Sequence, residues 1–237
     1  MSQNQWHGIA AKGNFTGEVK LFPFLTFKSG IAVDLKREQS DSFTPKYYLD
    51  GDEYSSYATV GRTVYNTDYW VFDNYLTYAQ KFDKHNVSVM VGTSAEKERY
   101  EEIAASKQGM ANNDPSQQII NAGTINPSAG GWYSVNTLSS YFGRVFYSFD
   151  NRYMITANVR WDGSSKFGSG NRWGFFPSVS GGWNFSEEHF LESTKSWLSQ
   201  GKLRVGWGEI GNQTIPAGAY LSQYGNGHPS MWYAQYY

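Results

Sequence analysis

The sequence contains no cysteine, which excludes disulfide bonds and thiolate metal sites. It carries no block of basic residues and its formal net charge is −1, so nucleic acid is not an expected partner. No apolar run approaches the ~18 residues that a membrane-spanning helix needs. The first residues, MSQNQWHGIAAKG, lack a basic segment followed by an apolar one, so no signal peptide is expected in this chain.

Aromatic residues and glycine are abundant instead. Aromatics make up 18% of the chain, with nine Trp and 18 Tyr, and 25 glycines accompany them. This mixture favours strands and turns over helices, because aromatic side chains fit a pleated surface and glycine supplies positive φ angles. The mean hydropathy of −0.57 is low, but alternating strands of a β-barrel hide their hydrophobicity from such an average.

Two neighbouring stretches alternate strictly between apolar and polar residues. In residues 153–162, Tyr153, Ile155, Val159 and Trp161 share one face, and Asn158, Arg160 and Asp162 share the other. Residues 172–186 repeat the pattern, with aromatics on one face and small or polar residues opposite. An apolar face that ends in aromatics and lies opposite charges is typical of a membrane-spanning β-barrel wall.

The same period predicts about eight antiparallel strands in an all-β, up-and-down transmembrane barrel segment. The predicted strands are 14–21, 28–36, 68–80, 86–95, 137–149, 152–162, 172–186 and 202 to about 210. Short joins at 22–25, 82–85 and 150–151 alternate with long polar ones at 37–67, 96–136 and 163–171. This asymmetry indicates short periplasmic turns and long external loops.

Two segments of the chain are not expected to be strands. Residues 187–201 are predicted to form a short helix or helical turn at the membrane interface, with Ser186 as its N-cap. The start of the connection 96–136, EKERYEE, is expected to be a solvated rim that could make a helical turn.

No catalytic or metal-binding constellation is found. His7, His85, His189 and His228 lie far apart, and no pair has a helical two-histidine spacing. The acidic cluster around Gly51 (Asp50, Asp52 and Glu53) matches no full calcium loop and is interpreted as a solvated loop. DGSSKFGSG lacks the strand-to-helix context of a phosphate loop. We therefore expect neither an enzyme nor a cofactor or metal site.

Several ordered blocks resemble the SusC/RagA-type TonB-dependent outer-membrane transporters. They are SYFGRV at 140–145, R-x-DGSS-x-FG at 160–168, NRWG-x-FPSVS at 171–180, W-x-x-SEE-x-F at 183–190 and WLS-x-x-KLR-x-x-WG-x-x-GN at 197–212. The resemblance implies a 22-stranded, plugged barrel in the outer membrane of a Gram-negative cell. Residues 1–237 would form part of that β-barrel domain, without the plug domain and the signal peptide.

The resemblance also implies a function. Such proteins import oligosaccharides or peptides, with a SusD-like surface lipoprotein as lid and outer-membrane lipid around the barrel. TonB supplies the energy through an N-terminal region that this chain is expected to lack. A second interpretation is that the eight strands close into a small autonomous outer-membrane barrel with a structural or adhesive role, which strand number permits.

Candidate site residues follow from strand parity and from the loops. The charges expected to face the lumen, where they hold a plug, line a solute path or pair across neighbouring strands, are Asp34, Asp73, Arg144, Arg160, Asp162 and Arg204. The aromatic residues expected in external loops, where they contact a ligand or pack the loop, are Tyr47, Tyr48, Trp132 and Tyr133.

Overall fold

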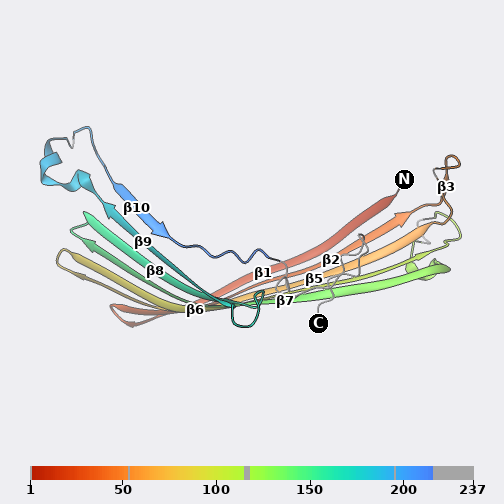
Figure 1. Cartoon of the computed structure of the whole chain (residues 1–237), viewed down its shortest axis with the longest axis horizontal. Helices are drawn as coiled ribbons and strands as arrows, with labels where there is room; N and C mark the ends of the chain where they lie inside the picture. The colour runs from red at the N-terminus through yellow and green to blue at the C-terminus, as the bar shows by residue number, and fades with distance from the viewer. Residues whose placement is uncertain (1, 53, 115–117, 195, 216–237) are drawn as a thin grey trace.

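The chain forms one curved antiparallel sheet of eight strands (Figure 1). This computed structural model describes residues 2–52, 54–114, 118–194 and 196–215. The strands, in their order across the sheet, are β1 (Gln3–Phe22), β2 (Leu25–Thr44), β5 (Thr59–Phe82), β6 (His85–Gln108), β7 (Ile125–Phe149), β8 (Tyr153–Ser164), β9 (Trp173–Trp183) and β10 (Leu203–Gly208). Every strand pairs antiparallel with its sequence neighbour in the sheet, which confirms the predicted up-and-down all-β fold.

The two faces of the sheet differ in composition and in exposure. On β8 the apolar residues are about half exposed, with Ile155 at 49% and Trp161 at 50%. Serines of the opposite face are nearly inaccessible, with Ser140 at 1% and Ser164 at 4%. Side chains crowd together on the concave side of a curved sheet and spread apart on its convex side. The polar face is therefore the concave one, and the apolar face is turned outward, the reverse of a protein folded in water.

Aromatic side chains mark both ends of the apolar face. Tyr153 and Trp183 are register partners at the end with the short turns. At the other end the rings of Tyr141, Trp161 and Trp173 lie together, with centroids 5.0 to 6.3 Å apart. The stretch 153–161 between these groups is about 27 Å long along the strand at ~3.3 Å per residue. The apolar band thus has the height and the aromatic girdles of a barrel that crosses a membrane.

The short joins are tight turns, as predicted, with two residues at 23–24 and 83–84 and three at 150–152. Asp150 and Asn151 have φ angles of 53° and 54°, and Asp83 has 49°. Two successive residues with positive φ are the signature of the turn whose twist matches that of the flanking strands, and Asp and Asn tolerate this conformation well. The turns at 23–24, 83–84 and 150–152 all lie at the same end of the sheet.

Two of the three long polar connections, 37–67 and 96–136, were predicted wrongly, because much of them is strand, whereas the third, 163–171, is confirmed to within two residues. β2 runs on to Thr44 and β5 begins at Thr59, and the region 96–136 contains the end of β6 and the first half of β7. EKERYEE is part of β6 and not a helical turn. Beyond the apolar band, on the side away from the short turns, both faces of the sheet carry charges. The ion pair of Arg37 with Asp68, for example, projects from the same face as the apolar residues. Because water lies on both sides of the sheet there, these strand segments lack the alternation of apolar and polar residues by which a strand in lipid is recognised.

The remaining connections at that end form a small buried cluster and a short hairpin. Phe43, Ala58, Val60 and Met110 are each 1–5% exposed and pack together. The hairpin joins β3 (Tyr47–Tyr48) to β4 (Tyr54–Ser55), and a 3-10 turn, η2, spans Ile120–Ala122. These contacts give the membrane-distal ends of the strands a fixed shape.

Residues 187–201 were predicted to form a short helix or helical turn, and the helical turn is confirmed. The chain forms two 3-10 turns, η3 (Phe185–Glu187) and η4 (His189–Thr194), and no α-helix in the described part of this segment. The predicted N-cap was wrong: Asn184 precedes η3 without a capping hydrogen bond, and Ser186 is buried inside the turn. The side chain of Glu188, which separates the two turns, bonds to β8 and β9, and this anchor interrupts a continuous helix. No helix in the described part of the chain is long and apolar enough to cross a membrane.

Gly92 allows an aromatic ring to lie flat across the polar face, which gives a first prediction. A Cβ atom at Gly92 would lie 2.6 Å from the ring of Phe142 and 2.7 Å from the backbone oxygen of Asn74. Gly92→Val is therefore expected to lower stability by ~1–3 kcal/mol through overpacking. The temperature at which the folded band is lost in heat-modifiable electrophoresis measures this. Gly181→Val is the control, since nothing lies within 4 Å of a Cβ there. Equal losses in the two variants would contradict the expectation.

Candidate functional site

The six charged candidates all lie on the polar face of the sheet. β2 carries Asp34, β5 carries Asp73 and β7 carries Arg144, while β8 and β10 carry the remaining three. Arg160 and Asp162 bond along β8, with Nε 2.7 and 2.8 Å from the two carboxylate oxygens. Asp34 pairs with Lys12 of the neighbouring strand at 2.8 Å. Arg144 and Arg204 are exposed.

Two of these charges, Asp73 and Arg160, line a shallow hollow on the polar face. The hollow is about 440 Å³ and is lined by acidic, basic and aromatic groups, including Asp73, Glu96, Arg160 and Phe142. Arg160 also donates a hydrogen bond to Ser140 Oγ at 2.9 Å. In register, Asp73 lies opposite Ser94, which lies opposite Ser140. The polar face thus presents a hydrophilic track across β5 to β8, at the level where the other face is apolar.

The four aromatic candidates lie in two different settings. Tyr47 and Tyr48 are in the β3–β4 hairpin, where the Tyr48 ring is 6.1 Å from Tyr54 and 73% exposed. Trp132 and Tyr133 were predicted to be in a loop, which is wrong, because both belong to β7. As neighbours on a strand they point to opposite faces. Trp132 is on the polar face, where its ring lies 4.8 Å from that of Tyr100.

Sequence reasoning missed an anchor at the end with the short turns. Glu188 is 8% exposed and accepts three hydrogen bonds, from Tyr153 Oη at 2.5 Å, Trp183 Nε1 at 3.0 Å and Arg152 Nη1 at 3.0 Å. Arg152 also reaches Asp150 in the adjacent turn at 2.6 Å. The carboxylate therefore ties the 3-10 segment to β8 and β9. The only sequence signal is the SEE block, which does not reveal the partners.

The Glu188 anchor makes stability depend on pH, which gives a second prediction. Hydrogen bonds from Tyr153 and Trp183 hold the pKa of Glu188 below its usual range. A group whose pKa is depressed by folding stabilises the protein above its unfolded pKa of ~4.3, and that contribution is lost as pH falls through the lower folded pKa. Thermal melts between pH 7 and pH 3 are expected to show an acid-induced loss that is smaller in Glu188→Gln. An identical acid loss in both proteins would contradict this role.

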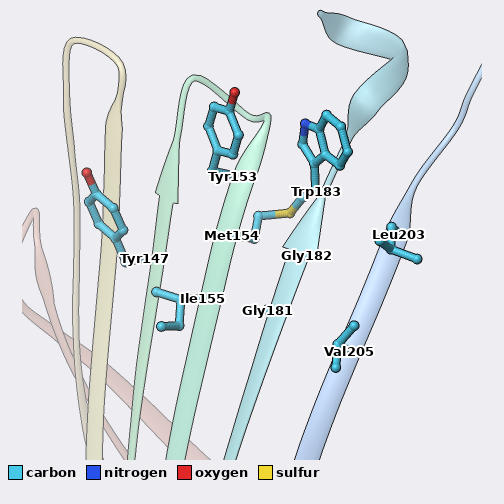
Figure 2. Close-up of a pocket in the computed structure, with 9 residues that line it drawn as sticks. All are labelled: Tyr147, Tyr153, Met154, Ile155, Gly181, Gly182, Trp183, Leu203 and Val205. Atoms are coloured by element: carbon cyan, nitrogen blue, oxygen red, sulfur yellow. The ribbon is translucent and has the colours of Figure 1, made fainter.

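The apolar face carries a hollow at the same end (Figure 2). It is about 420 Å³ and lies where Gly181 has no side chain between Ile155 and Val205, its register partners. Tyr153 and Trp183 close it toward the rim. Its lining is almost entirely apolar, so it suits hydrocarbon and not a polar ligand.

No group of three or more His, Cys, Asp or Glu side chains among the described residues is arranged to hold a metal ion. In the acidic cluster around Gly51, the backbone N–H of Asp52 donates to Asp50 Oδ1 at 2.9 Å, which is a local turn contact. Glu53 lies outside the described residues.

An apolar outer face with aromatic girdles, a charged inner face and short turns at one end define an outer-membrane β-barrel protein. The family model described as "TonB dependent receptor-like, beta-barrel" matches residues 8–236. The chain belongs to this family, and its sheet is part of a barrel wall in the outer membrane.

Curated relatives agree with this assignment. The chain is 32% identical to the TonB-dependent receptor SusC of Bacteroides thetaiotaomicron over 87% of its own length and 20% of SusC. It is 34% identical to the TonB-dependent receptor P39 of Formosa agariphila over 83% of its length and 19% of that protein. The chain thus spans about a fifth of the length of these relatives.

A solved structure has the same fold. The structure of the RagAB peptide transporter superposes with a TM-score of 0.82, at 24% identity, over 91% of this chain and 24% of that one. The predicted resemblance to the SusC/RagA type is confirmed by these relatives together.

Proposed function

We propose that the chain forms part of the wall of a TonB-dependent transporter that imports oligosaccharides or peptides. A SusD-like surface lipoprotein serves as its partner, and TonB supplies energy. Residues 1–237 belong to the β-barrel domain in this proposal. The observation that carries it is the hydrophilic track across β5 to β8 on the concave face, directly behind an apolar band that faces lipid. Such a wall separates a hydrophilic path from the membrane.

The names of the similar proteins support the proposal. SusC and the Formosa proteins are named TonB-dependent receptors, and RagAB is named a peptide transporter. In this proposal the six charges from Asp34 to Arg204 line the solute path or hold a plug inside it. Arg160 with Asp162 and Lys12 with Asp34 are already paired, so these two groups shape the wall more than they attract a solute.

Uptake by living cells tests the proposed function. Deletion of the gene is expected to abolish uptake of the natural solute, to be found by screening fluorescent oligosaccharides and peptides. Deletion of tonB or addition of a proton ionophore is expected to have the same effect. Deletion of an adjacent lipoprotein gene tests the lid. Uptake of every probe at the wild-type rate after deletion of this gene would refute a transport role.

The alternative of a small autonomous barrel receives no support from the sheet, and this gives a third prediction. Within the described residues β1 and β10 each pair with a single neighbour, so the sheet does not close. The isolated 237-residue chain refolded into detergent is expected to aggregate or to oligomerise through these open edges. Light scattering and size-exclusion chromatography measure this. A monomeric, protease-resistant barrel from this chain alone would favour the autonomous alternative.

A further inference from the structure

Four aromatic rings form a continuous row across the polar face. Trp6 of β1 stacks on Tyr65 of β5 with ring centroids 5.5 Å apart and planes 6° from parallel. Tyr65 lies 6.3 Å from Tyr100 of β6, and Tyr100 lies 4.8 Å from Trp132 of β7. We call this set the aromatic row. Its two ends stay accessible, because Trp6 is 56% exposed and Trp132 is 45% exposed.

The aromatic row lies beyond the apolar band, on the side away from the short turns. Tyr65 is about 16 Å along β5 from Trp70, which marks the upper end of the band on that strand. At this level the opposite face of the sheet carries the Arg37–Asp68 and Arg99–Glu101 ion pairs. The row is therefore above the membrane, where a solute first meets the concave side of the wall.

Strand alternation gives the polar face of β6 only acidic charges beside the row, while the other face carries Glu101 together with the cations. In β6, Glu98 and Glu102 share the polar face with Tyr100, whereas Lys97 and Arg99 point to the other face. Across the sheet, Tyr65 lies in register between Glu38 of β2 and Glu102.

Two contacts hold the acidic side of the row in place. Glu102 accepts hydrogen bonds from Trp132 Nε1 at 3.2 Å and from Tyr100 Oη at 3.5 Å. Of the nearby cations on the polar face, Lys36 shares a register row with Thr67 and Tyr100, two strands away from Tyr100, and Lys12 is paired with Asp34. The row is thus an aromatic surface with carboxylates at its centre.

We propose that the aromatic row is a binding site for the positively charged side chains of a peptide solute. An ammonium or guanidinium group is attracted by the face of an aromatic ring, most strongly by Trp, and by the carboxylates beside it. Trp132 and Glu102 together offer both attractions to one cation. A neutral oligosaccharide would stack on the ring faces and could donate hydroxyl hydrogen bonds to the carboxylates, but it would lack the charge attraction that a cation gains from them. The inference rests on the proposed function, because it needs solute to pass along this face.

Binding to the intact protein in nanodiscs tests the inference. The probes are a fluorescent tetrapeptide with two arginines, the same peptide with citrulline in their place, and maltohexaose. Citrulline keeps the shape of arginine and removes its charge. The arginine peptide is expected to bind about tenfold more tightly than the citrulline peptide at low salt, with the difference shrinking at high salt. Fluorescence anisotropy gives both affinities, and competition gives that of maltohexaose.

Two pairs of variants locate the site. Each pair compares a residue on the polar face with its neighbour in sequence, which points to the opposite face. Glu102→Gln is expected to reduce the arginine preference severalfold, whereas Glu101→Gln, on the opposite face of the same strand, leaves it unchanged. Trp132→Ala is expected to weaken the arginine peptide about tenfold, whereas Tyr133→Ala does not. Unchanged heat-modifiable migration confirms that each variant is folded.

Three results would overturn the proposal. The first is equal affinity for the arginine and citrulline peptides, and the second is an equal effect of the two variants within either pair. The third is tight maltohexaose binding that Trp132→Ala abolishes and Glu102→Gln does not alter. The last result would define a neutral sugar platform. The binding and uptake assays test different hypotheses. Uptake without a preference for charge would refute only this inference. Charge-selective binding without uptake would refute only the proposed function.

Discussion

Val159→Arg is expected to impair assembly of the barrel severely. Val159 lies in the middle of β8 on the apolar face, between its register partners Gly143 and Pro177. It is 45% exposed on the side of the sheet that faces lipid. An arginine near the bilayer midplane on this face costs ~2–4 kcal/mol. That is a large fraction of the 5–15 kcal/mol that is typical of folded proteins.

The control for this change is Thr156→Arg. Thr156 lies on the same strand but on the polar face, between Phe146 and Ser180, so an arginine there stays in water. The folded fraction of the intact protein in outer-membrane preparations, measured by heat-modifiable electrophoresis, is expected to fall only for Val159→Arg. Equal losses would mean that the assignment of the two faces is reversed or that this segment does not face lipid.

Glu188→Ala is expected to be the most damaging change outside the membrane band. It removes three hydrogen bonds at once and leaves Arg152, whose side chain is 16% exposed, with Asp150 as its remaining acidic partner. Each of these bonds involves an ionised group and is stronger than a hydrogen bond between neutral groups, so losing all three together is expected to be costly. The thermal midpoint of the purified protein in detergent is expected to fall accordingly, and the 3-10 segment is expected to become sensitive to protease.

Glu187→Ala provides the matched comparison, because Glu187 is the preceding residue and is exposed. It is expected to change the thermal midpoint little, as surface substitutions usually do. If Glu187→Ala and Glu188→Ala destabilised the protein equally, the loss would belong to the local turn and not to the links with β8 and β9.

Strand parity was predictable wherever the sheet crosses lipid. The alternation of Tyr153, Ile155, Val159 and Trp161 with polar residues appears in the structure as an alternation of exposure along β8. It follows from a local rule, since successive side chains of a strand face different solvents there. The turn at Asp150–Asn151 was equally local and was also predicted.

Features that depend on the surroundings of the strands were not predictable. β6 continues through Lys97 and Glu102 with charges on both faces, so its polar sequence looks like a loop. The aromatic row joins four residues on four strands, and no short window of sequence contains two of them. The bonds of Glu188 likewise depend on strands that precede it by up to 36 residues.

The up-and-down order of the sheet bears on how the wall assembles. Each strand of the large sheet bonds only to the strands that precede and follow it in that sheet along the chain, and three of the joins close over two or three residues. Loop closure is entropically cheap for such short joins. Hairpins β1–β2, β5–β6 and β7–β8 can therefore form before they meet. The slower steps are then the β2–β5, β6–β7 and β9–β10 pairings, whose connections of 45–58, 109–124 and 184–202 must close first.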